Sequence, residues 1–271
     1  MSTGEYHSVD GLTVVLHDAV LGIGLDRPAH RNAINDTMMA AFIDAVDAAG
    51  RDERVRAIHV TGTGDHFCGG ADIVARNTGD QHRPRVGAIQ RRLPSQAHRL
   101  IPLLCSVQVP VVCAVRGWAA GIGLQIAAAA DFTVVADDAR LWEPFASRGF
   151  TPDSGATWLL PRMVGMVRAR ELLLLGRELS GIEAAAWGLV HRAVPADQVD
   201  PAAGELAATL AGGPTVSLGL TKWLLHAGAS LPLEEQLRNE GFAMELSSRG
   251  EDFREGLAAF AERRAPDFKG R

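Results

Sequence analysis

A strand, a glycine-rich turn and a buried helix are expected in succession between Pro110 and Asp131, PVVCAVRGWAAGIGLQIAAAAD. The β-branched segment PVVCAV predicts a buried strand, Gly117 and Gly121 mark the turn, and the alanine-rich remainder predicts the helix. The first N–H groups of a helix lack partners within it, and the dipole there favours negative charge. This arrangement can bind a phosphate or a developing oxyanion, and an ordinary strand-to-helix crossover is the alternative.

A second segment, GTGDHFCGGADI at residues 62–73, has four glycines in its first nine residues. This density indicates close approach of the backbone to another group. Other ligand motifs are missing from the sequence. Residues 117–123 spell G-x-x-x-G-x-G and not the dinucleotide fingerprint, no P-loop lysine is present, and the nine histidines form no zinc-binding pair.

The surrounding pattern predicts the elements that hold these segments. A hairpin is expected from LTVVLH and VLGIGLD, then a helix capped by Asp36 and ended by Gly50, then the strand VRAIHVTG. Residues 76–95 are polar and basic and are expected to form a surface loop that could act as a lid, followed by a helix to Val107. The remaining predicted elements are strands FTVVA, ARLW and LVHRAV, and helices ARELLLLG and GIEAAAWG.

The alternation of strands and helices predicts an α/β class, with a core over residues 1–200 and a helical region over residues 201–271. The net charge of −5 argues against a general nucleic-acid-binding protein. The N-terminus is polar, and the longest apolar region is too short to cross a bilayer. The three cysteines match no metal-binding or disulfide pattern, which favours a reducing, cytoplasmic location with no membrane partner.

Four segments in this order resemble the crotonase, or enoyl-CoA hydratase/isomerase, superfamily. They are LDRPAHRNAIN, FCGGADI, VRGWAAGIGLQIAAAAD and WGLVHRAVP, and the final FAERRAPDFKGR is also similar to the family C-terminus. The resemblance covers nearly the whole chain. It implies a crotonase-like spiral of ββα turns with a C-terminal helical trimerisation region, and an acyl-CoA thioester as substrate. It further implies a homotrimer or a dimer of trimers.

The resemblance implies that backbone N–H groups of Ala71 and Ile122 hold the thioester oxygen. Fixed donors stabilise the negative charge that moves to this oxygen when a neighbouring carbon loses a proton. Ile122 differs from the small residue usual in the family, and its side chain could narrow the acyl pocket. The other implied substrate-binding residues are Arg31, Ala33, Gly70, Asp72, Ile73, Gly121, Trp118, Phe145 and Arg263. Among these, Arg31 and Arg263 are candidates for the CoA phosphates, the latter from a neighbouring subunit.

The two glutamates of the family's hydratases fall at Gln125 and Phe145, neither of which can transfer a proton near neutral pH. The segment FTPDSGATWLLPRMVG instead resembles the branch with ring-1,2-epoxyphenylacetyl-CoA isomerase, in which an aspartate, here Asp153, is the acid–base residue. Two other interpretations remain open at this position. Pro-Asp-Ser is a common helix start, so Asp153 could be only a cap. Glu143 is an alternative carboxylate.

The function expected from these residues is isomerisation of an acyl-CoA double bond through an enolate, with no bound cofactor and coenzyme A carried by the substrate. One alternative is a hydratase-like lyase of fatty acid metabolism. Another is a dehalogenase-type reaction in which Asp153 is a nucleophile and His98 its base. A non-enzymatic acyl-CoA-binding protein is the alternative outside the enzyme class.

Overall fold

A computed structural model of the chain describes residues 6–72 and 86–271. Its main sheet has the order β1-β2-β3-β4-β6-β9, in which β1 and β2 are antiparallel and the remaining neighbours are parallel. The strands are β1 (Leu12–His17), β2 (Val20–Leu25), β3 (Ala57–Gly62), β4 (Val111–Val115), β6 (Phe132–Ala136) and β9 (Arg192–Val194). The predicted α/β class is confirmed.

The predicted hairpin is formed by β1 and β2, which pair from Leu12 with Leu25 to His17 with Val20. Asp18 and Ala19 both have positive φ, at 46° and 66°, as a two-residue hairpin turn requires. By contrast, all five residues of the central strand β4 are buried, because helices cover both faces of the sheet there. This explains the continuous apolar run of PVVCAV.

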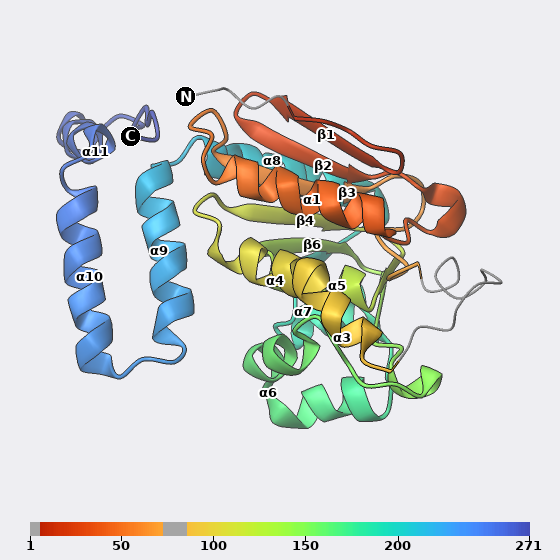
Figure 1. Cartoon of the computed structure of the whole chain (residues 1–271). Helices are drawn as coiled ribbons and strands as arrows, with labels where there is room; N and C mark the ends of the chain where they lie inside the picture. Colours follow the sequence, from red (N-terminus) through yellow and green to blue (C-terminus); the bar gives the residue numbers. More distant parts are fainter. Residues whose placement is uncertain (1–5, 73–85) are drawn as a thin grey trace.

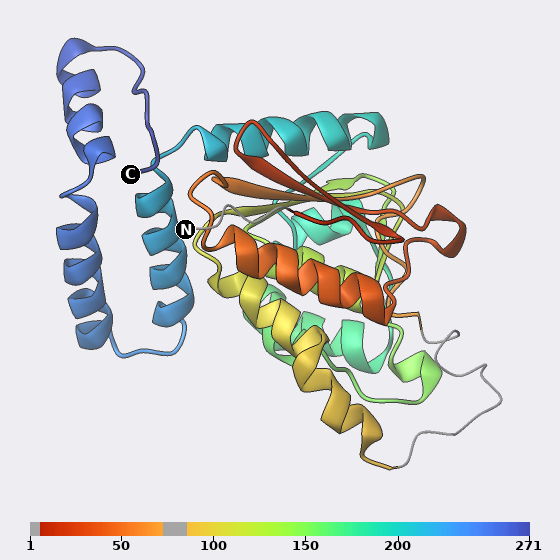
Figure 2. The ribbon, with the colours of Figure 1, turned by 45° about the horizontal axis from the view of Figure 1, so that its top comes forward.

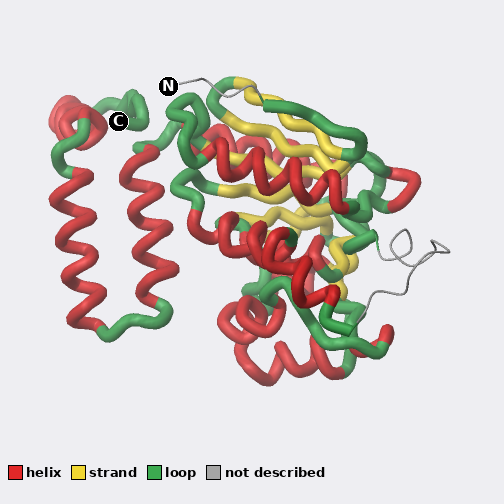
Figure 3. The backbone as a smooth tube through the Cα atoms, viewed as in Figure 1, coloured by secondary structure: helices red, strands yellow, loops and turns green. Residues whose placement is uncertain are grey.

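A second sheet of three strands lies beside the main one, in the order β5-β7-β8 (Figure 3). Its strands are β5 (Trp118–Ala120), β7 (Arg140–Trp142) and β8 (Leu179–Ser180). The interpretation of RGWAAG as a turn alone was therefore wrong. Trp118 to Ala120 form a strand because they pair in parallel with Arg140 to Trp142, a partner that local sequence does not reveal.

Helices α1 and α8 lie on opposite faces of the main sheet (Figures 1 and 2). The helices are α1 (Asp36–Ala49), α3 (Ala88–Arg92), α4 (Ala97–Ser106), α5 (Ile122–Ala129), α6 (Ala156–Leu174), α7 (Gly181–Ala186), α8 (Val199–Ala211), α9 (Thr215–Gly228), α10 (Leu233–Ser247) and α11 (Glu251–Glu262). Asp36 was predicted to cap α1, and this prediction was wrong. The cap is Asn35, whose side chain accepts from the Met38 N–H at 2.9 Å.

The described part of the predicted 76–95 loop is not irregular. It contains α3, which its helix-favouring residues Ala88 to Arg92 explain, and then a short 3-10 helix over Leu93–Ser95. The rest of that predicted loop, up to residue 85, lies outside the described residues.

Helices α9 to α11 lie at one side of the α/β core (Figure 1). Lys222 of α9 attaches them to it: the Lys222 Nζ donates to the Asp131 carboxylate at 2.7 Å and to the Leu104 carbonyl at 2.8 Å. The Asp131 carboxylate also accepts from the Val111 N–H at 2.8 Å, at the start of β4. A buried cation therefore holds the helical region against the central strand. The predicted division at residue 200 stays a prediction, and α8, which begins at Val199, packs against the main sheet.

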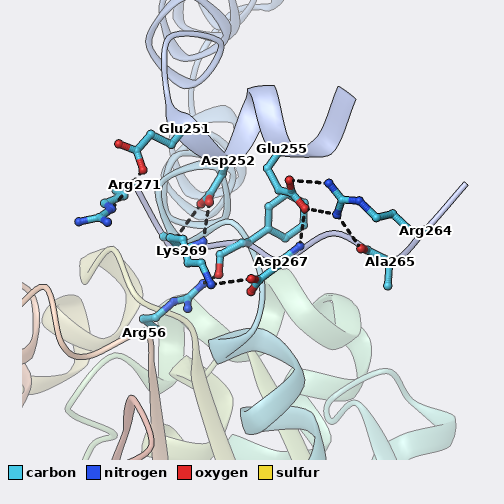
Figure 4. Close-up of polar contacts among 11 residues, drawn as sticks. Arg56, Glu251, Asp252, Glu255, Arg264, Ala265, Asp267, Lys269 and Arg271 are labelled. Atoms are coloured by element: carbon cyan, nitrogen blue, oxygen red, sulfur yellow. Dashed lines mark hydrogen bonds and ion pairs between the residues drawn. The ribbon is translucent and has the colours of Figure 1, made fainter. Parts of the chain in front are cut away.

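The C-terminal tail folds back along α11 (Figure 4). The Asp252 carboxylate accepts from the backbone N–H groups of Lys269 and Gly270, at 2.6 and 2.8 Å. Arg56, which precedes β3, donates to the carbonyls of Gly213 and Phe268 at 2.7 and 3.1 Å. The tail is thus joined to both the helical region and the core. None of the described helices is long and apolar enough to span a membrane.

Candidate active site

Two backbone N–H groups with no protein acceptor define the candidate site. They belong to Ala71, after the glycine pair Gly69–Gly70, and to Ile122, the first residue of α5. Within residues 6–72 and 86–271, neither N–H donates a hydrogen bond to another group. The unpaired Ile122 N–H follows from its place at a helix start, where no intrahelical acceptor exists. Both predicted oxyanion donors are therefore available to a ligand.

The two donor segments are held together by backbone bonds. The Cys68 N–H donates to the Trp118 carbonyl at 2.8 Å, and the Ala120 N–H donates to the Cys68 carbonyl at 2.9 Å. Glycines make this close approach possible. A Cβ on Gly70 would lie 3.2 Å from the Ala120 oxygen, and one on Gly123 would lie 2.6 Å from the Cys68 Cβ. The glycine density in the 62–73 segment thus has the predicted cause, although the other group is the protein's own backbone.

The turn before α5 has a second constraint, at Gly121. This residue has φ 52° and ψ −121°, a conformation that other residues rarely adopt. Its N–H donates to the Trp142 carbonyl at 2.9 Å, which connects the start of α5 to the end of β7. Gly121 therefore fixes the backbone just before the Ile122 N–H, and its contact with substrate stays a prediction.

The segment around Arg31 forms a second layer beside the Ala71 turn. The Ile34 N–H donates to the Gly70 carbonyl at 2.9 Å, and the Gly69 N–H donates to the Arg31 carbonyl at 2.7 Å. Ala33 lies half-buried in this segment, and the Arg31 side chain is exposed. Asp72, predicted to bind substrate, forms an ion pair with Arg27 at 2.9 Å. The structure thus places Arg31, Ala33 and Asp72 around Gly70 and Ala71, and their contacts with substrate stay predictions.

Asp153 does not cap the helix that follows it. Helix α6 begins at Ala156 after Gly155, and no side chain caps its N-terminus. The Asp153 carboxylate is half-buried and accepts from the Ser154 hydroxyl at 2.9 Å. Positive φ at Ser154 and Gly155, 53° and 89°, turns the chain between Asp153 and the helix. The capping interpretation is therefore wrong, and this carboxylate is left for another role.

Gln125 and Glu143 form a buried polar pair that the sequence pattern did not reveal. The Gln125 amide nitrogen donates to Glu143 Oε2 at 3.4 Å, and their exposed fractions are 1% and 0%. Burial raises the pKa of Glu143 well above its ordinary value, the negative charge of Asp153 acts in the same direction, and the Gln125 hydrogen bond opposes them. The Glu143 carboxyl group therefore holds its proton more strongly than an exposed glutamate does.

Phe145 is buried and stacks edge-on against Phe150, with ring centroids 5.4 Å apart. These two rings lie in the loop that leads from β7 to Asp153, so their contact joins two parts of that loop. Trp118 contacts Trp142 at a centroid distance of 5.9 Å, and the Arg140 guanidinium lies 4.2 Å from its ring. Phe145 and Trp118 are the candidate walls of an acyl pocket, and this role stays a prediction.

Two sequence-predicted residues, Arg263 and His98, are not brought to this site. Ile73 lies outside the described residues. Arg263 is exposed at the end of α11, in the helical region beside the core (Figure 1). His98, the base that a dehalogenase reaction would need, is exposed on α4. This exposure gives a nucleophilic Asp153 no support.

Cys68 is the thiol nearest the donors, and it is fully buried. The Gly70 N–H donates to its sulfur at 3.4 Å, and burial raises the pKa of Cys68 to about 12. It therefore remains a thiol and shapes the turn rather than acting as a nucleophile. Among the residues that the structure describes, no group of three or more histidines, cysteines or carboxylates could hold a metal ion.

Comparison with known proteins places this geometry in a family. Residues 16–271 match the family described as enoyl-CoA hydratase/isomerase. The chain is 36% identical over 255 residues to 1,2-epoxyphenylacetyl-CoA isomerase of Escherichia coli strain K12, covering 93% of this chain and 95% of that protein. It is 30% identical over 260 residues to 2,3-dehydroadipyl-CoA hydratase of the same strain, covering 96% and 99%.

A solved structure of enoyl-CoA hydratase from Bacillus anthracis superposes with a TM-score of 0.89 at 28% identity, covering 96% of this chain and 100% of that one. This similarity confirms the predicted crotonase-like fold. The similar proteins include a named isomerase and named hydratases, so the two reactions must be distinguished by the residues of the site.

Proposed function

The chain belongs to the enoyl-CoA hydratase/isomerase family, and we propose that its own reaction is double-bond isomerisation of an enoyl-CoA thioester. Family membership makes an acyl-CoA thioester the substrate class. The choice of isomerisation over hydration rests on the environment of Asp153. Its carboxylate is half-buried, caps no helix and contributes to the raised pKa of the buried Glu143, whereas the two hydratase glutamate positions hold Gln125 and Phe145.

In the proposed reaction, the thioester oxygen lies between the N–H groups of Ala71 and Ile122. The Asp153 carboxylate takes a proton from the α carbon of a 3-enoyl thioester, and the electron pair moves onto that oxygen. The protonated Asp153 then returns the proton to the γ carbon, and the double bond moves into conjugation with the thioester. Each backbone donor of this kind is typically worth about 3–4 kcal/mol of transition-state stabilisation.

Coenzyme A enters this reaction as part of the substrate, and the proton transfers need no further cofactor. We place Arg31 at its phosphates, because this exposed side chain extends from the segment bonded to Gly69 and Gly70. Arg263 would reach them only from another subunit, so its role requires a homotrimer or a dimer of trimers. A cytoplasmic location is proposed because the three cysteines are free thiols.

Two other functions give different products. A hydratase would add water to crotonyl-CoA and form a 3-hydroxyacyl-CoA, and a non-enzymatic binder would retain the thioester unchanged. A hydratase needs groups that place and deprotonate a water molecule. Because the chain is similar to a named hydratase, the hydratase reaction is tested alongside isomerisation.

The test incubates the full-length protein separately with a 3-enoyl-CoA and with crotonyl-CoA and identifies the products by NMR. The proposal predicts a conjugated 2-enoyl-CoA from the first substrate and very slow hydration of the second. Rapid hydration with no isomerisation would instead assign the protein as a hydratase. CoA binding by calorimetry, without proton exchange at the α or γ carbon in deuterated water, would assign it as a binder.

A further inference from the structure

Glu143 connects the two elements that carry the chemistry. It directly follows β7, and the preceding residue, Trp142, accepts a hydrogen bond from Gly121 at the start of α5. Its partner Gln125 lies in the first turn of α5, where the Gln125 N–H donates to the Gly121 carbonyl at 3.0 Å. The loop after Glu143 leads to Asp153. The Gln125–Glu143 pair is therefore a side-chain link between the oxyanion-donor helix and the Asp153 loop.

The pair has one hydrogen bond and two unpartnered oxygens. Within the described part of the chain, Gln125 Oε1 and Glu143 Oε1 are buried and have no hydrogen-bond partner. Two acceptor oxygens cannot satisfy each other, and a buried acceptor without a donor is costly. A proton on Glu143 Oε1 supplies the missing donor, and Gln125 Oε1 is an acceptor on the residue already bonded to that carboxyl group.

We propose that Glu143 is a positioning residue of the site, which in its neutral form makes a two-bond acid–amide pair with Gln125 and so fixes Ile122 relative to Asp153. This role rests on the isomerase function proposed above. In the pair, the Glu143 O–H donates to Gln125 Oε1 while the Gln125 N–H donates to Glu143 Oε2. No proton passes from the pair to the substrate, so the reaction remains balanced at Asp153.

Loss of the Glu143 proton weakens the link in two ways. The O–H donor disappears and returns Gln125 Oε1 to an unpartnered state. The new negative charge also repels Asp153, which is the charged side chain among the described residues whose field acts on Glu143, while α5 contributes the uncharged Gln125. The spacing between the donor helix and the Asp153 loop then loses its restraint on the alkaline side of the pH profile.

The experiment compares kcat and KM for 3-enoyl-CoA isomerisation between pH 6 and 10 in wild type, Glu143→Gln and Glu143→Leu. Glutamine keeps both hydrogen bonds with Gln125 at every pH, so Glu143→Gln is expected to match wild-type kcat at pH 6 and to lose the alkaline decline. At alkaline pH, the kcat of wild type is expected to fall about tenfold below that of Glu143→Gln, which corresponds to the free energy of one buried hydrogen bond. Glu143→Leu is expected to lower kcat by about tenfold or more at every pH, since it removes both bonds.

The control is Glu205→Gln on the exposed face of α8, which is expected to keep the wild-type profile. Melting temperatures of all variants, measured at each pH, separate a positioning effect from unfolding. A Glu143→Gln profile identical to wild type would overturn the positioning role while leaving the isomerase function intact. A large loss of kcat in Glu143→Gln at pH 6 would also overturn it, because the carboxyl group would then be needed for more than its hydrogen bonds. Absence of isomerisation in wild type would overturn the function itself.

Discussion

The Gly121 N–H donates to the Trp142 carbonyl at 2.9 Å, and this bond joins the start of α5 to the end of β7. The Ile122 donor follows the first of these residues, and Glu143 follows the second. In the proposed site, the Ile122 N–H and the Glu143 carboxyl group are thus joined by one backbone contact and by the buried side-chain pair beside it. Residues that support this contact are expected to affect activity without touching substrate.

Gly123→Ala is expected to destabilise the fold by about 1–3 kcal/mol, the usual cost of overpacking a well-packed core. The added Cβ would lie 2.6 Å from the Cys68 Cβ and 2.7 Å from the Cys68 oxygen, so the two donor segments must separate. Urea unfolding measures the loss of unfolding free energy, and a lower kcat for isomerisation would report the displacement of the donor N–H groups. The matched control is Gly204→Ala in α8, where an added Cβ meets no atom within 4 Å, and this change is expected to stabilise by about 0.5–1 kcal/mol.

Lys222→Met is expected to cost about 3 kcal/mol of unfolding free energy, because it leaves the half-buried Asp131 carboxylate without its buried cation. Limited proteolysis between α8 and α9 should become faster as the helical region loosens. The control is Lys269→Met, whose exposed pair with Asp267 is expected to contribute less than about 1 kcal/mol. Equal effects of the two substitutions would contradict the structural role given to Lys222.

Glu143 gives a pH-dependent contribution to stability whose sign follows from its raised pKa. Its ordinary value is 4.5, so above that pH the unfolded chain has lost this proton while the folded chain retains it. Stability from this group is therefore fully present below pH 4.5 and is lost as the pH rises toward the folded-state pKa, by up to about 1.4 kcal/mol per pH unit. Denaturant unfolding of wild type and Glu143→Gln across pH 4–8 measures the difference. A difference that stays constant with pH would contradict a neutral Glu143.

Asp153→Ala is expected to change the unfolding free energy by less than about 0.5 kcal/mol, as for a substitution that removes no cap or core contact. A capping aspartate would instead cost about 1 kcal/mol on the same change. The structure favours the smaller effect, because α6 begins at Ala156 with no side-chain cap. Thermal denaturation at neutral pH distinguishes the two values.

The elements with strong local patterns were predictable from the sequence. The β1–β2 hairpin, the buried strand β4 and the fully buried helix α5 follow from β-branched runs, turn residues and alanine content. Local signals failed where a distant partner decides the structure. Trp118 to Ala120 were interpreted as a turn because each pairs with a residue of β7 that lies 22 positions later in the chain.

The candidate site was predictable only in part, for the same reason. Ala71 and Ile122 were identified through their motifs, and their N–H groups are free of protein acceptors among the described residues. The buried pair of Glu143 with Gln125 was not predicted, because the register of Glu143 at the end of β7 and its contact with α5 depend on tertiary packing. The cap of α1 was assigned to Asp36, whereas the structure has Asn35 there, and the alternative in which Asp153 caps α6 was wrong because no side chain caps that helix.

Proton transfer by Asp153 is tested most directly by the isomerisation rate of Asp153→Asn with a 3-enoyl-CoA. The comparisons are wild type and Asp138→Asn, which changes an exposed aspartate beyond β6. Asparagine keeps the shape of aspartate and cannot carry the proton, so kcat is expected to fall by about a hundred- to ten-thousand-fold. CoA binding and melting temperature are expected to stay near wild type, and Asp138→Asn is expected to be fully active. Wild-type turnover in Asp153→Asn would contradict proton transfer by this residue and, with it, the proposed mechanism.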